Sequence, residues 1–458
     1  MEERTFVWQR YPSTEEYLDR YLKTLASENP FLNKLALRLR AHAGARLFDW
    51  IDFLIIPADQ AESCEELHFQ IESEQEAHKV LHLPGSCLPR LIVGPYAGMR
   101  RGAAVKVDRI ADFQAAQNCP APIEGLPFSG FRRSLVDTQG DTGIFAVERR
   151  VAGSVEPGRE EADPAQQAEM TSRYLTAWEV WMTRPRKTSE TPDMEFLQRI
   201  AAETHQRAQR IVDLVGKEIA ADVVMSAERT YWQAKNTIGR DVKFQLDQLG
   251  LGWANHDHHT FRCSRSFMGD VVRLMALIGF STREKFYAGD EAGWGAQVME
   301  HPAGFALFID TDLDQAEIDI DFTRETLPKR NRLGTVGLWC RLHGESLFDA
   351  GLHHIAGRFE FREMYRRLSD TDSIMEPFSD FSYLKQSFTL GERWPVSRHR
   401  LTQLVKDDLL SSQQADMFTR GGALGSHLEI IERKEGFKGF NQQNVSDIIS
   451  RTDPRENR

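Results

Sequence analysis

The chain has 458 residues, 41% of them hydrophobic, and a formal net charge of −11, which suits two or three domains with sizeable cores. Lys and Arg are scattered rather than gathered in a basic stripe, which argues against a nucleic-acid partner. No apolar run reaches the roughly 18 residues of a membrane span, and residues 1–10 lack a secretory signal pattern. We therefore expect a cytoplasmic protein without a membrane partner. The five cysteines form no CxxC pair, which argues against a zinc ribbon or a disulfide framework.

The first 150 residues predict an N-terminal α+β module. Ser13 and Glu16 form a capping box that begins a helix, and a second helix is predicted over residues 31–43. Strands are predicted over residues 46–57, 67–71, 91–94, 103–108 and 143–148.

A polar stretch from Val151 onward marks a change of composition, and it includes Gly153, Pro157, Gly158, Glu160, Glu161, Asp163 and Pro164. Such a stretch predicts a linker. Residues 166–248 then predict mostly helix, with a break between 184 and 192. We therefore assign residues 151–250 to a linker and helical segment.

Residues 251–445 alternate between strand and helix patterns, and a polar tail, 446–458, is predicted to follow. The predicted strands cover 255–263, 283–287, 296–300, 304–310, 351–360 and 424–431, and an amphipathic helix that ends at a glycine covers 266–279. This β-α-β-β-β order, used more than once, predicts an α+β fold of paired modules rather than a parallel sheet.

The densest chemical signal lies in the strand predicted over 255–263. Alternate side chains of a strand share a face, so His256, His258, Thr260 and Arg262 are expected to point one way. A strand that turns His and Arg inward lines a site. The alternative is an edge strand whose histidines face solvent.

The strand predicted over 351–360 repeats this arrangement. His354 and Arg358 share a face and are separated by four residues, like His258 and Arg262. Two imidazoles on paired strands can bind a metal. The two arginines can hold a carboxylate further out as bidentate donors.

The third signal lies in the last predicted strand, where His427, Glu429 and Ile431 share a face. A glutamate inside a largely apolar strand is costly unless it is paired or bound to a metal. Two histidines and one carboxylate form the facial triad of non-haem Fe(II) oxygenases, which leaves positions open for substrate and O2. Zinc accepts the same donors, and His256 competes with His258 as the first ligand.

These three motifs resemble ligand motifs of the vicinal-oxygen-chelate superfamily. Residues 351–356 (Gly-Leu-His-His-Ile-Ala) and 428–433 (Leu-Glu-Ile-Ile-Glu-Arg) resemble the second and third ligand motifs of 4-hydroxyphenylpyruvate dioxygenase. Residues 257–262 (Asp-His-His-Thr-Phe-Arg) resemble the first ligand motif of the 2-oxoadipate dioxygenase/decarboxylase (hydroxyglutarate synthase) family. The resemblance covers roughly residues 240–450. It implies that His258, His354 and Glu429 bind the metal and that Arg262 holds the substrate carboxylate.

The resemblance further implies paired βαβββ modules that form a cupped sheet around Fe(II), and the oxidative decarboxylation and hydroxylation of a small 2-oxo acid by O2. Arg262, with Arg358 as a second candidate, would fix the distal carboxylate. An extradiol catechol dioxygenase, a glyoxalase-type isomerase or lyase, and a non-enzymatic binding protein stay open as alternatives. The exact substrate, the identity of the metal, the role of residues 1–230 and assembly into a homo-oligomer also stay open.

A short internal echo links the two halves of the chain. Residues 35–54 and 244–259 each predict a helix that runs into a strand carrying an aspartate. Phe53 stands in the first copy where His258 stands in the second. The echo predicts that the first half is a copy of the module without a metal.

Overall fold

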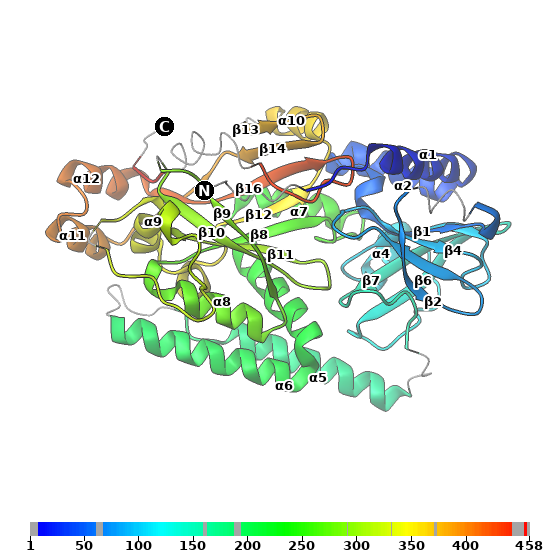
Figure 1. Cartoon of the computed structure of the whole chain (residues 1–458), viewed down its shortest axis with the longest axis horizontal. Helices are drawn as coiled ribbons and strands as arrows, with labels where there is room; N and C mark the ends of the chain where they lie inside the picture. The colour runs from blue at the N-terminus through cyan, green and yellow to red at the C-terminus, as the bar shows by residue number, and fades with distance from the viewer. Residues whose placement is uncertain are drawn as a thin grey trace.

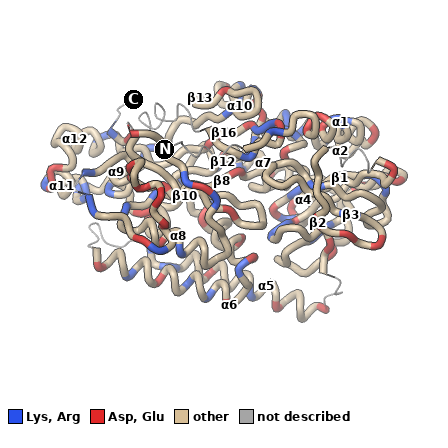
Figure 2. The backbone as a smooth tube through the Cα atoms, viewed as in Figure 1, with Lys and Arg blue, Asp and Glu red and all other residues tan. Residues whose placement is uncertain are grey.

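The computed structural model describes residues 8–60, 67–158, 163–186, 194–290, 292–330, 332–370, 373–441 and 453–455. Glu160 and Glu161 of the predicted linker, most of the helix break predicted between 184 and 192, and most of the predicted polar tail lie outside these ranges. Two mixed sheets and several helices make up the described chain, so the predicted α+β class is confirmed (Figure 1). None of the described helices is long and apolar enough to cross a membrane. Figure 2 shows acidic and basic residues interspersed along the chain.

The N-terminal sheet has seven strands in the order β2-β3-β4-β1-β5-β7-β6. They are β1 (Ile51–Ile56), β2 (Gln70–Glu74), β3 (Lys79–His82), β4 (Arg90–Val93), β5 (Arg101–Lys106), β6 (Phe131–Gln139) and β7 (Thr142–Arg149). Helices α1 (Pro12–Glu28), α2 (Pro30–Arg38) and α4 (Ile110–Gln117) accompany this sheet. Asn29 separates α1 from α2, and its side chain accepts a hydrogen bond from the backbone of Leu32, which caps α2.

Three helices join the two sheets: α5 (Pro164–Met182), α6 (Met194–Gln233) and α7 (Thr237–Asp247). Asp163 caps α5, and α6 is broken at Gly216, whose φ of 78° suits glycine. Figure 1 shows α5 and α6 side by side beneath the C-terminal sheet. The fully buried pair of Arg184 and Glu228, with their side chains 2.5 Å apart, fixes the end of α5 against α6.

The C-terminal half contains the βαβββ unit twice. The first unit is β8 (His256–Arg262), α8 (Met268–Leu277), β9 (Ser281–Tyr287), β10 (Trp294–Glu300) and β11 (Ala306–Asp312). The second is β12 (His354–Arg358), α10 (Phe361–Ser369), β13 (Met375–Asp380), β14 (Leu384–Thr389) and β16 (Ala423–Arg433). The strands form one sheet in the order β13-β14-β16-β12-β8-β11-β10-β9. The prediction of paired βαβββ modules is therefore confirmed.

Further elements are inserted into this plan. Helix α9 (Thr335–His343) lies between the two units, and β15 (Glu392–Trp394), α11 (Arg398–Lys406) and α12 (Ser412–Gly421) precede β16. The sequence patterns missed these elements, together with β3, β6, β13, β14, α4 and α10. The strand predicted over 46–57 begins only at Ile51, because residues 47–50 form a 3-10 turn.

The two sheets share one pattern of strand pairing. In the C-terminal sheet, β8 and β12 are antiparallel neighbours, and each has a parallel partner, β11 and β16 respectively. In the N-terminal sheet, β1 and β5 are antiparallel neighbours, with β4 and β7 as their parallel partners. The N-terminal sheet thus has the arrangement that the internal echo predicts.

The shared pattern gives the N-terminal counterparts of the three predicted ligands. Ala104 pairs with Phe53 and Phe145, as Ala356 pairs with the first and third predicted ligands. Gly102 lies two residues before Ala104, as the second predicted ligand lies two residues before Ala356. Phe53 and Phe145 belong to a buried apolar cluster, with ring centroids 6.3 Å apart. Neither a phenyl ring nor glycine offers a metal donor, and a metal-free first half stays a prediction.

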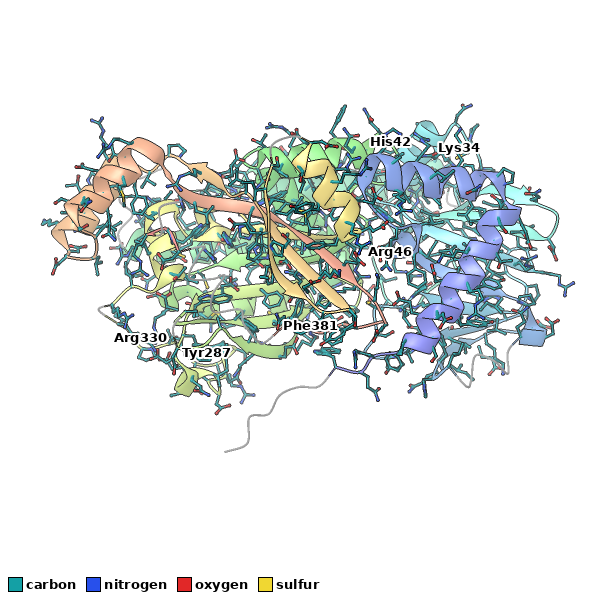
Figure 3. The ribbon with its side chains drawn as sticks, turned by 90° about the horizontal axis from the view of Figure 1, so that it is seen from above. Lys34, His42, Arg46, Tyr287, Arg330 and Phe381 are labelled. Carbon is teal, nitrogen blue, oxygen red and sulfur yellow. The ribbon has the colours of Figure 1, made fainter. Side chains whose placement is uncertain are left out.

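The two halves meet where the chain leaves β16. Arg46 donates to the backbone oxygen of Arg433 over 2.7 Å, and Figure 3 shows Arg46 between the N-terminal helices and the C-terminal sheet. The backbone N–H of Gly436 donates to Glu15 over 2.9 Å, and its oxygen accepts from the backbone of Cys87 over 3.1 Å. The N-terminal module therefore supports the end of a strand that carries a predicted ligand.

Candidate metal centre

The structure brings the three predicted ligands together on the adjacent strands β8, β12 and β16. The Nε2 atom of His258 lies 3.1 Å from Glu429 Oε2, and the Nε2 atom of His354 lies 3.3 Å from the same oxygen. The two Nε2 atoms are 3.3 Å apart. All three side chains are buried. Donors at right angles around an ion that lies 2.0–2.2 Å from each are roughly 3 Å apart, so the three atoms fit one face of a metal's coordination shell.

Asp257 orients the first histidine. Its carboxylate lies 3.1 Å from His258 Nδ1, so it accepts the proton of that nitrogen and leaves Nε2 facing the other two donors. Arg433 binds the same carboxylate in a bidentate manner, over 2.7 and 2.9 Å, and Arg358 adds a bond of 3.0 Å. Although burial would raise the pKa of Asp257, Arg433 and Arg358 hold it well below its usual range.

Neighbouring side chains also hold the other two donors. Gln386 donates to Glu429 Oε1 over 2.9 Å, which leaves Oε2 for the two histidines. The Thr260 hydroxyl lies 2.8 Å from His354 Nε2. The Gln386 bond fixes the carboxylate before any ion binds, as second-sphere partners do at metal sites. The Thr260 hydroxyl instead occupies the His354 nitrogen that would bind the ion, so an ion would displace it.

The protonation of the donor set shows that it favours a positive charge. Burial opposes a charge on His258, but Glu429 and Asp257 outweigh it and raise the pKa of His258 to about 9. His258 and His354 in turn lower the pKa of Glu429, which burial alone would raise. Burial lowers the pKa of His354 to about 4, so this imidazole is neutral at physiological pH. A buried site that keeps a carboxylate ionised and holds a proton beside it suits a divalent cation.

A cavity with a volume of about 70 Å³ opens beside the donors. Its apolar wall is aromatic and consists of Phe286, Trp294, Phe308, Phe378, Phe388 and Phe440. The Phe440 ring meets the His258 ring edge-on, with centroids 5.2 Å apart. These rings surround the donors with apolar surface and limit the water that reaches them.

Arg262 lines the polar end of this cavity. Its side chain is 3% exposed, and neither Nε nor Nη1 has a hydrogen-bond partner in the described part of the chain. The nearest carboxylate, Asp310, is 3.9 Å from Nε. Burial lowers the pKa of Arg262, and it raises the pKa of Asp310 to about 7 even though Arg262 opposes that rise. A buried guanidinium with free N–H groups in a cavity wall fits a carboxylate of a bound molecule.

Two expectations about neighbouring residues differ from the structure. Strict alternation puts His256 on the face of His258, but the β8–β12 register shifts at this point, and His256 turns to stack on Phe305 with ring centroids 4.8 Å apart. The sequence also predicts that Arg358 lies in the cavity beside Arg262. It donates to Asp257 instead and is not among the residues that line the cavity.

Several cavity residues escape the sequence reasoning. Gln386 lies on β14, which no periodic pattern reveals, and Asp310 belongs to an acidic run that is typical of a solvated turn. His353 precedes the first residue of β12, so alternation does not place it with His354, yet both line the cavity. The adjacency of the two histidines at 353 and 354 is the only local signal for His353.

No protein-family model and no curated protein matches the chain. Three solved structures show limited likeness. A protein provisionally named a hydrolase from Shewanella frigidimarina NCIMB 400 has 13% identity, covers 46% of this chain and 92% of its own, and gives a TM-score of 0.33. A glyoxalase I mutant from Zea mays has 8% identity, covers 57% and 68%, and gives 0.18. A protein provisionally named a dioxygenase from Bacillus subtilis subsp. subtilis str. 168 has 11% identity, covers 88% and 91%, and gives 0.15. Because these TM-scores are low, the functional assignment depends on the side chains of this protein alone.

Proposed function

We propose that this protein is an Fe(II)-dependent dioxygenase that oxidatively decarboxylates a 2-oxo acid, with His258, His354 and Glu429 as metal ligands. The observation that supports the proposal is the convergence of these donors to 3.1–3.3 Å from three adjacent strands. When bound, Fe(II) would supply a redox-active centre with positions open to both the 2-oxo acid and O2. In this proposal the partners are that small molecule and O2, and the compartment is the cytoplasm.

The side chains of this protein would bind and orient the substrate. Arg262 would hold a second carboxylate, distant from the 2-oxo end, through its free N–H groups. The aromatic wall would exclude water, and Asp257 would keep His258 in the tautomer that presents Nε2. The substrate itself supplies the four electrons that O2 needs, two through the loss of CO2 and two through oxidation of its remaining carbon chain.

Arg262 also favours a 2-oxodicarboxylate over the alternative substrates. A catechol or a hemithioacetal without a carboxylate would leave Nε and Nη1 of the buried guanidinium without hydrogen bonds in the complex, which is costly. A carboxylate at this position would satisfy the guanidinium with charge-assisted bonds.

The test is an O2-electrode assay on protein loaded anaerobically with Fe(II). We expect O2 uptake with 2-oxodicarboxylates, release of one CO2 per O2, and no uptake by the His354→Ala variant. Ring cleavage of a catechol would overturn the proposal in favour of an extradiol enzyme. Isomerisation of a hemithioacetal without O2 uptake would overturn it in favour of a glyoxalase-type enzyme.

A further inference from the structure

A second group of histidines lies in the wall of the same cavity. His354 and His427 are paired across β12 and β16, and the backbone N–H of His427 donates to the oxygen of His353 over 3.4 Å. Ring centroids are 4.7 Å apart for His353 and His427, 4.9 Å for His354 and His427, and 5.4 Å for His353 and His354. One nitrogen of each ring lies within 4.8 Å of the others. We call these three residues the imidazole set.

The ring nitrogens of this set are available to a ligand. His353 Nδ1 lies 3.1 Å from the backbone oxygen of Gly425, so it donates its proton there and leaves Nε2 with a lone pair. A bond of this kind is what metal-binding histidines usually make with their other nitrogen. In the described part of the chain, His354 Nδ1 and His427 Nε2 are buried without a hydrogen-bond partner. Unpaired polar atoms in the interior are costly unless a bound group satisfies them.

We propose that the imidazole set is a second metal site, selective for Zn²⁺, that competes with the His258–His354–Glu429 site. Three imidazoles and one open position form the donor set of a common tetrahedral zinc centre. The His258–His354–Glu429 set adds a carboxylate and matches the facial triad of Fe(II) sites. The two sites therefore differ in donor type within one cavity.

Competition arises because both sets include His354. A neutral imidazole has one lone pair, since its other nitrogen carries the proton. His354 therefore serves one ion at a time. Zn²⁺ in the imidazole set removes a ligand from the other site. The existence of the second site does not depend on the dioxygenase assignment, whereas inhibition of O2 uptake by Zn²⁺ does.

The test uses two double variants of the full chain. His258→Gln with Glu429→Gln removes the first site and keeps the imidazole set, and His353→Gln with His427→Gln does the reverse. Each is titrated with Co²⁺, whose visible absorption reports its ligand geometry, and bound metal is measured after desalting. We expect one Co²⁺ in each double variant and one in the wild type. Zn²⁺ should displace Co²⁺ from the first variant at equimolar concentration.

Folding of each variant is checked by circular dichroism. If the His258→Gln, Glu429→Gln variant folds and takes up no Co²⁺, the imidazole set is not a metal site. Two Co²⁺ ions in the wild type would overturn competition. If that variant does not fold, the single variant His427→Gln decides. The proposal expects that at least tenfold more Zn²⁺ is needed to prevent Fe(II) from loading this variant than to prevent it from loading the wild type. An unchanged Zn²⁺ requirement would refute the site. Each readout reports metal binding rather than turnover, so failure of the dioxygenase assignment leaves this test intact.

Discussion

Replacement of Arg262 separates a substrate-binding role from a structural one. The guanidinium is 3% exposed, has two nitrogens without hydrogen-bond partners in the described chain, and lies 3.9 Å from the nearest carboxylate. A residue in this state lowers stability in the absence of substrate and contributes binding energy in its presence. Function and stability should therefore respond to substitution with opposite signs.

The expected magnitudes follow from this environment. Arg262→Lys keeps the charge but loses the planar fork, and the loss of one charged hydrogen bond of about 1.5–3 kcal/mol lowers kcat/KM for a 2-oxodicarboxylate roughly 10- to 100-fold. Arg262→Met keeps the apolar stem and removes a buried charge with two nitrogens that lack hydrogen-bond partners in the described chain, which raises the free energy of unfolding by about 1–3 kcal/mol. Asp310, the nearest carboxylate, lowers the stability of Arg262→Met only a little. Its pKa is already about 7, so it takes up a proton when the arginine is removed.

The assay combines O2-uptake kinetics with thermal unfolding of the same preparations, and iron content confirms that the metal site is intact. Arg358→Met is the matched control, since Arg358 also follows a predicted ligand by four residues but is paired with Asp257 over 3.0 Å. We expect that control to lower stability, by about 1–3 kcal/mol. If Arg262→Lys keeps kcat/KM within about twofold, or Arg262→Met lowers the melting temperature, the substrate-binding role is wrong.

Three further outcomes test the structure. Asp257→Asn should weaken Fe(II) binding about 10- to 100-fold in an anaerobic titration, because His258 loses the partner that sets its tautomer; unchanged affinity would refute that role. Burial lowers the pKa of His343 to about 3. Below about pH 6.5 the unfolded chain therefore binds a proton at this residue that the folded chain does not, and the free energy of unfolding decreases as the pH is lowered. His343→Gln should recover about 2 kcal/mol of the stability lost between pH 7 and 5 in urea titrations, with His399→Gln as the exposed surface control. Phe145→Ala should lower the free energy of unfolding by about 3–5 kcal/mol, since its ring is fully buried in the N-terminal sheet; a loss below 1 kcal/mol would show that this cluster is loosely packed.

The three central strands of the candidate metal site could be predicted because their signals are local. Residues 256–262 and 354–358 combine alternation with donor side chains, and Glu429 interrupts an otherwise apolar run. The βαβββ order of the first unit follows from strand and helix patterns within its segment, whereas α10, β13 and β14 of the second unit gave no such pattern. Such features depend on neighbours along the chain, which periodicity reports directly.

The remaining features depend on contacts between distant segments. His256 leaves the predicted face because β8 shifts its register against β12, where Asp257 meets Arg433 from β16, 176 positions away. Arg358 is drawn to the same carboxylate and away from the cavity. Gln386 lies on a strand whose mixed composition gives no periodic signal. No local sequence pattern could predict the contacts of these three residues, because each contact joins strands that are distant in the sequence.

Anomalous diffraction at the iron edge, from crystals grown anaerobically with Fe(II), locates the bound metal itself. We predict a single peak about 2.0–2.2 Å from His258 Nε2, His354 Nε2 and a Glu429 oxygen. A peak surrounded by His353, His354 and His427, or one outside the cavity, would contradict the assignment of these three iron ligands.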